Sequence, residues 1–123
     1  MAAVVYTVIA EFEDEATLRA YLAWLTGGHA AAVVAAGALS AEVIGPLAGP
    51  TGALEGPLRL DCRYTFPTLG AFRAYETDHA PRLRAEGAAL FGAVQGLRVS
   101  RSLGTRAAVF GGPGPSGRTA GDQ

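Results

Sequence analysis

The sequence contains one cysteine, two histidines and no lysine among its 123 residues. A lone cysteine, Cys62, cannot form an internal disulfide, and this usage is typical of proteins from the reducing cytoplasm. Two histidines and one cysteine without a cluster of carboxylates match no ligand spacing of a zinc or iron site. We therefore expect no metal, no cofactor and a cytoplasmic location.

An excess of one charge and a long apolar run are also missing. The formal net charge is −1, which leaves no basic surface to follow a phosphate backbone and argues against nucleic acid as a partner. The longest apolar run, Ala30–Ala36, is far shorter than the roughly 20 residues that a membrane helix needs. Met1–Phe12 contains neither a cationic region nor a cleavage-site pattern, so we expect no secretory signal and no membrane partner.

Half of the residues are apolar, and the length suits one domain whose core needs no disulfide or metal. The C-terminal segment is different, because it is rich in glycine and proline and poor in large apolar residues. We expect one domain over residues 1–104 and a disordered tail over residues 105–123.

The first half of the chain predicts a strand, a helix and a second strand. Val4–Phe12 is apolar on both sides, which indicates a central strand. Asp14 is a good N-cap for the helix that follows. Apolar residues then recur at helical spacing: Leu18, Tyr21, Leu22, Leu25, Ala32, Val33 and Ala36. Gly27 and Gly28 interrupt this stripe, and Leu39–Ile44 is the second strand.

The second half repeats this order. Gly45–Pro57 is too dense in glycine and proline for regular structure. Leu58–Phe66 alternates strictly, with apolar side chains on one face and Arg59, Asp61, Arg63 and Thr65 on the other. Thr68 caps a second helix, Pro81 breaks it, and Leu97–Leu103 is the fourth strand.

The resulting order, β-α-β-β-α-β, predicts an α+β protein with the ferredoxin-like fold, a four-stranded antiparallel sheet with two helices on one face. The chain also contains two similar phrases, in which Trp24 precedes His29 and Tyr75 precedes His79. They occupy equivalent helices in the two halves, so this repetition is architectural.

The other face of such a sheet is uncovered. It includes Val5 and Ile9, and burial of one such side chain is worth about 1.5–3 kcal/mol. A second copy packing sheet against sheet would cover it, so we expect a homodimer. Arg59, Asp61 and Arg63 share this face, where they either line a partly polar cavity or pair with one another.

Two segments resemble the dimeric α/β-barrel superfamily, "YLAWLTGGHAAAVVAAGALSAEV" and "YETDHAPRLRAEGAALFG". Within it, the chain is most similar to a small bacterial family of unknown function. The resemblance covers residues 4–103. It implies a homodimer whose sheets form a shared barrel, with a ligand pocket between sheet and helices. Superfamily relatives include cofactor-free monooxygenases of antibiotic biosynthesis, lactone isomerases, polyketide cyclases and haem-dependent enzymes.

The two histidines are the candidate catalytic residues. The ring of a histidine ionises near neutral pH, so His29 or His79 could act as a general base. The alternative for His29 is a buried, neutral ring. The alternative for His79 is a ring that hydrogen-bonds the backbone freed at Pro81. A single histidine could also ligate haem, but nothing in the sequence specifies it.

Four further residues are candidates for substrate binding. Arg59 and Arg63 could hold a carboxylate or phenolate by charge-assisted hydrogen bonds, while Trp24 and Tyr64 would shape the cavity. These residues predict a small-molecule-binding protein, with a cofactor-independent monooxygenase or cyclase acting on an aromatic or polyketide-like compound as one reading. The other reading is a non-catalytic, ligand-binding or structural homodimer, and the sequence leaves open whether the protein is an enzyme.

Overall fold

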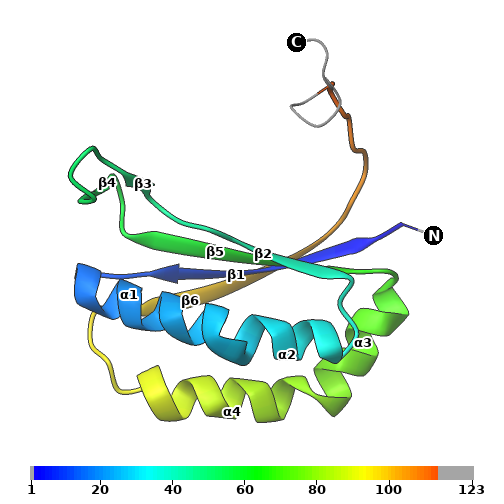
Figure 1. Cartoon of the computed structure of the whole chain (residues 1–123). Coiled ribbons are helices and arrows are strands. Elements are labelled where there is room, and N and C mark those ends of the chain that lie inside the picture. Colours follow the sequence, from blue (N-terminus) through cyan, green and yellow to red (C-terminus); the bar gives the residue numbers. More distant parts are fainter. Residues whose placement is uncertain (1, 114–123) are drawn as a thin grey trace.

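The computed structural model describes residues 2–113 and has the predicted α+β, ferredoxin-like fold (Figure 1). Four antiparallel strands form one sheet in the order β2-β5-β1-β6, and the helices lie together on one of its faces. Within the described residues, no helix is long and apolar enough to cross a membrane.

Strand β1 (Val4–Glu11) occupies the centre of the sheet, as its two apolar sides predict. It pairs with β5 (Arg59–Phe66) on one side and β6 (Arg98–Thr105) on the other, while β2 (Ser40–Ile44) pairs with the far side of β5. Tyr6 lies opposite Tyr64 in this register.

The alternation of β5 is confirmed, because its apolar side chains are buried beneath the helices: Leu60, Cys62, Tyr64 and Phe66. Thr65 is an exception on the opposite face, since it too is buried. The segment that leaves β6 accounts for this difference. Arg106 donates its backbone N–H to the carbonyl of Ala3, and its Nη2 lies 3.5 Å from Thr65 Oγ1.

The first helical segment begins at the predicted cap. Asp14 Oδ1 accepts a hydrogen bond from the backbone of Thr17 at 2.7 Å, and α1 runs over Glu15–Trp24. A π-helical turn, η1 (Leu25–His29), joins it to α2 (Ala30–Ala35). Gly28 has φ of 157° inside that turn, so the glycine pair interrupts the α-helix as predicted.

The connection between β2 and β5 contains regular structure, and the prediction that it contains none was wrong. Two-residue strands β3 (Leu47–Ala48) and β4 (Leu54–Glu55) form a small hairpin. Glycine makes the hairpin possible, because Gly52 has φ of 86° in its turn. Gly49 donates a backbone hydrogen bond across the hairpin to Ala53.

The second helical segment is divided where Pro81 predicts. Thr68 Oγ1 accepts a hydrogen bond from the backbone of Ala71 at 3.0 Å, and α3 (Leu69–Asp78) starts there. Pro81 lies in the first turn of α4 (Ala80–Phe91), where its missing N–H needs no partner.

The last described segment of the chain spans the predicted boundary between the domain and the tail, at residues 104 and 105. Strand β6 extends to Thr105, one residue into the segment assigned to the tail, and residues 106–113 form no regular structure. Residues 114–123 of the predicted disordered tail lie outside the described residues.

Candidate functional site

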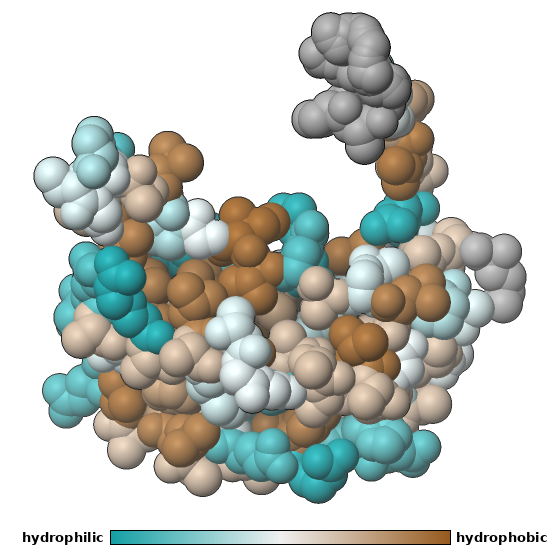
Figure 2. Space-filling view, viewed as in Figure 1, coloured by the Kyte–Doolittle hydropathy of each residue, from teal (hydrophilic) through white to brown (hydrophobic). Residues whose placement is uncertain are grey.

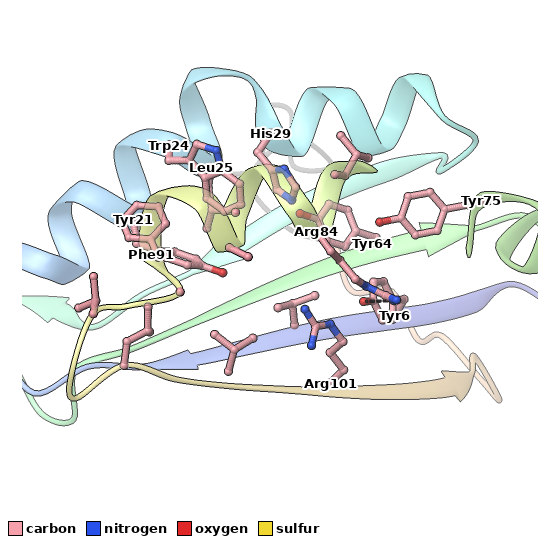
Figure 3. Close-up of a pocket in the computed structure, with 18 residues that line it drawn as sticks. Tyr6, Tyr21, Trp24, Leu25, His29, Tyr64, Tyr75, Arg84, Phe91 and Arg101 are labelled. Atoms are coloured by element: carbon pink, nitrogen blue, oxygen red, sulfur yellow. Dashed lines mark hydrogen bonds between the residues drawn. The ribbon is translucent and has the colours of Figure 1, made fainter. Parts of the chain in front are cut away.

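A cavity of about 310 Å³ lies between the sheet and the helices (Figure 3). This volume is at the lower end of the range for small-molecule sites. Most of the lining is apolar or aromatic, and it comes from α1, η1, α3, α4, β1, β5, β6 and the α4–β6 loop. The lining residues are Tyr6, Val8, Tyr21, Trp24, Leu25, His29, Tyr64, Tyr75, Leu83, Arg84, Gly87, Ala88, Phe91, Gly92, Val94, Leu97, Val99 and Arg101.

Aromatic rings form one end of this cavity. The ring of Trp24 lies 5.3 Å from that of Tyr21 and 5.6 Å from that of Phe91, both edge to face. Gly87 of α4 allows this close approach, because a Cβ atom there would lie 2.9 Å from Trp24 Cη2. The small residue on α4 thus positions the indole against the helix.

The π-helical turn brings Trp24 and His29 together. Their rings stack with centroids 4.0 Å apart and an interplanar angle of 21°. In a regular α-helix, side chains five positions apart point about 140° away from each other. The wider turn places both rings on the same side, so the glycine pair has a direct effect on the site.

His29 is half-buried, and its Nδ1 is buried without a hydrogen-bond partner. Burial lowers the pKa of His29, and the negative charge of Glu86 partly opposes this. The ring is therefore neutral at neutral pH, with one N–H and one lone pair.

Arg84 enters the same cavity from α4 (Figure 3). Its Nη2 donates to Tyr6 Oη at 3.2 Å and lies 3.5 Å from Glu76 Oε2. The hydrogen bond to Tyr6 raises the pKa of Arg84. Its Nε, by contrast, is buried without an acceptor, and among the described residues only this atom and His29 Nδ1 are buried side-chain polar atoms of that kind.

Burial weakens the acidity of three phenols in the cavity, those of Tyr21, Tyr64 and Tyr75. Burial raises the pKa of Tyr75 to about 12, although the positive charges of Arg84 and Arg101 oppose the change. Burial also raises the pKa values of Tyr64 and Tyr21. These phenols remain protonated at neutral pH and act through hydrogen bonds, which leaves His29 as the cavity residue suited to accept a proton.

Three of the six predicted site residues line the cavity: Trp24, His29 and Tyr64. His79 is half-buried at the junction of α3 and α4 and is absent from the lining. Its predicted catalytic role would require a ligand elsewhere.

Arg59 and Arg63 lie on the opposite face of the sheet. Arg59 Nε lies 2.6 Å from Asp61 Oδ1, and this hydrogen bond lowers the pKa of Asp61. Arg63 Nη1 lies 3.6 Å from Glu42 Oε1 on the neighbouring strand β2. Both arginines of the open face thus form ion pairs within the chain, Arg59 with Asp61 and Arg63 with Glu42.

Sequence reasoning missed the two arginines of the cavity, Arg84 and Arg101. A signal for Arg84 exists in the sequence, because it shares a helical stripe with Gly87 and Phe91. Alternation along β6 likewise puts Arg101 on the helix-facing side, where its Cα pairs with that of Val8.

Neither the protein-family models nor the curated proteins gave a match to this chain. Solved structures with a similar fold do exist. A dimeric ferredoxin-like protein from an uncultured marine organism is 11% identical, with a TM-score of 0.60, over 89% of this chain and 100% of its own. A monooxygenase from the gene ActVA-Orf6 of Streptomyces coelicolor, in complex with Nanaomycin D, is 21% identical, with a TM-score of 0.63, over 90% of this chain and 94% of its own.

A third structure, an ethyl tert-butyl ether d family protein from Bacillus halodurans, is 18% identical, with a TM-score of 0.53, over 80% of this chain and 96% of its own. These similarities confirm the predicted resemblance to dimeric ferredoxin-like, α/β-barrel proteins at the level of the fold. This fold carries many unrelated functions, so the site must supply the argument for function.

Proposed function

We propose that the protein binds a small aromatic compound in this cavity and that His29 acts there as a general base. One observation carries the proposal. The two buried polar atoms that lack a partner within the described residues, His29 Nδ1 and Arg84 Nε, both belong to residues lining the same cavity. Unsatisfied buried groups are rare in folded proteins, and a ligand with polar atoms would satisfy them.

The chemistry follows from the charge states of the two groups. A neutral His29 can take a proton from an acidic C–H or O–H of the ligand. The guanidinium of Arg84 can then stabilise the anion that forms. Trp24 stacks on His29, while Tyr64 contributes its ring to the lining beside β1.

Within this scheme, the reaction is that of a cofactor-independent monooxygenase or a cyclase acting on an aromatic or polyketide-like compound. In the monooxygenase, a CH₂ group of the substrate and O₂ become a carbonyl group and water, so the substrate supplies the electrons. The fold shared with the Streptomyces monooxygenase supports the monooxygenase as the reaction.

Proton exchange tests the general base before any natural substrate is known. The probe is 2-tetralone, a ketone fused to a benzene ring whose benzylic CH₂ group next to the carbonyl is acidic, and its exchange with D₂O is followed by NMR. We expect His29→Gln to slow the protein-catalysed exchange at least tenfold, while the matched control His79→Gln, outside the cavity, retains it. Equal rates for the native protein and His29→Gln would contradict the proposal.

The alternative function is a non-catalytic, ligand-binding or structural homodimer. The ion pairs of the open face favour it, because Arg59 and Arg63 are already engaged by Asp61 and Glu42. In that case aromatic compounds would bind the cavity, but exchange would be no faster than in buffer.

The protein partner in the proposal is a second copy, docked on the open face of the sheet. Val5 and Ile9 are only half-buried there. The β3–β4 hairpin and the segment after β6 both rise on this side, away from the helices, and hydrophobic residues lie on both projections (Figures 1 and 2). Leu47 of the hairpin is 77% exposed and Phe110 is 93% exposed. Light scattering should give the mass of two chains, and a monomer at micromolar concentration would contradict the dimer.

A further inference from the structure

The end of the cavity opposite the aromatic rings is polar, and two arginine side chains line it. Arg84 reaches it from α4 and Arg101 reaches it from β6, so that both side chains enter the space between the helix and the sheet (Figure 3). We propose that this end is an anion-binding subsite, and that the ligand carries a carboxylate or phenolate oxygen bound by Arg84 and Arg101. This inference rests on the proposed function, since it specifies the ligand of the same cavity.

The charges of the lining support an anionic ligand. Arg84 and Arg101 are both part of it, whereas no aspartate or glutamate is. Within the described residues, Arg101 forms no ion pair, and Glu76 approaches Arg84 only to 3.5 Å. The polar end therefore carries two positive charges and one paired carboxylate, Glu76, which leaves a net positive charge.

The hydrogen-bond donors show where the anion would bind. Arg84 contacts Tyr6 and Glu76 through Nη2, and this leaves the buried Nε–H without an acceptor. Tyr6 Oη accepts the hydrogen bond from Arg84, so its own O–H can donate to a ligand. Arg101 adds a second guanidinium, whose charge acts on Tyr75 as that of Arg84 does. A ligand oxygen here would receive donors from α4, β1 and β6.

The location of the subsite also restricts the shape of the ligand. The ring system of the ligand would lie toward Trp24 and Phe91, and its anionic group toward Arg84. An aromatic carboxylate, or a phenol acidic enough to be ionised, has both features. A neutral hydrocarbon would leave Arg84 Nε without a partner.

Two probes of equal shape test the inference: 2-naphthoate and its neutral isostere 2-naphthamide, titrated into the full-length protein by calorimetry at pH 7.5. We expect the naphthoate to bind at least tenfold more tightly, because charge-assisted hydrogen bonds to an anion exceed those to an amide. An acidic nitronaphthol, ionised at this pH, tests whether a phenolate oxygen is accepted as well as a carboxylate.

The variants Arg84→Met and Arg101→Met should each weaken naphthoate binding about tenfold or more and leave naphthamide binding within about twofold. The matched control is Arg63→Met on the open face, which should change neither. Arg84→Lys retains the charge but loses Nε, so we expect it to restore only part of the preference. If Arg84→Met does not fold, the native protein still gives a test, because 0.5 M NaCl should weaken binding of naphthoate more than that of naphthamide.

The outcomes separate this inference from the proposed function. If both probes bind equally well, the anion subsite is refuted while the aromatic cavity stands. If neither binds, both proposals fail. A preference for naphthoate that survives in Arg84→Met and Arg101→Met would also overturn the subsite, because the charge recognition would then lie elsewhere.

Discussion

Replacement of Gly87 by alanine tests how α4 positions the cavity. In the native structure, a Cβ atom at this position would lie 2.9 Å from Trp24 Cη2 and 3.3 Å from Cζ2. The first distance is shorter than real carbon contacts allow. The indole must therefore move, and this would disturb its stacking on His29.

The expected change in stability has two opposing parts. Alanine in place of glycine stabilises a helix by about 0.5–1 kcal/mol, whereas overpacking a filled site destabilises by about 1–3 kcal/mol. The two ranges together predict that Gly87→Ala lowers the free energy of unfolding by up to about 2.5 kcal/mol.

Gly70→Ala in α3 is the matched control. A Cβ atom at Gly70 would meet only Thr68 Oγ1, at 3.7 Å, which is an ordinary contact. This variant should therefore gain the helix contribution without a clash. The measurement is urea denaturation of both variants, together with the fluorescence of Trp24, the single tryptophan of the chain.

The difference between the two variants measures the clash with Trp24. We expect it to be about 1–3 kcal/mol, together with a changed emission spectrum in Gly87→Ala only. Equal stabilisation by both substitutions, with unchanged emission, would refute the packing of Trp24 against α4.

Three further predictions concern other parts of the molecule. The pKa of His29 is lowered in the folded protein, so a proton binds this ring more tightly in the unfolded state. The free energy of unfolding should therefore fall as pH decreases below about 6.5. Urea denaturation at several pH values should show this loss in His79→Gln but not in His29→Gln. Thr68→Ala removes the N-cap of α3 and should lower the free energy of unfolding by about 1 kcal/mol; an unchanged urea midpoint would contradict this role. Phe110→Ser should weaken the dimer in sedimentation equilibrium, because Phe110 is 93% exposed in the single chain; an unchanged dissociation constant would remove this residue from the interface.

The fold could be predicted because the local patterns agree with the final packing. Strict alternation over Leu58–Phe66 defines both faces of a central strand, and every apolar position within β5 is buried in the structure. Asp14 and Thr68 mark helix starts through hydrogen bonds that depend only on near neighbours. The β3–β4 hairpin was missed because the glycines that suggest a loop also permit a tight turn.

The candidate site was predicted only in part, since it depends on backbone geometry that the sequence does not specify. The pair Gly27-Gly28 indicates a break in the helix, but the stacking of Trp24 on His29 requires a π-helical turn rather than a simple kink. Arg59 was placed on the correct face of the sheet, yet the cavity lies on the other one. A charged residue can be a candidate binding residue on either face of a sheet. Contacts between elements distant in the sequence determine which face carries the cavity.

The edge of the sheet determines how a ligand reaches the cavity. Val99 and Arg101 line the cavity, yet every residue of β6 is exposed to solvent. The cavity is therefore open on the side of this strand, where Arg101 is accessible, whereas Arg84 Nε is buried deeper inside. An anionic compound approaching from β6 would meet the charge of Arg101 before that of Arg84. Because Arg101 is exposed, its contribution should act mainly on the rate of association and be sensitive to salt, whereas loss of the buried contact to Arg84 should mainly increase the rate of dissociation.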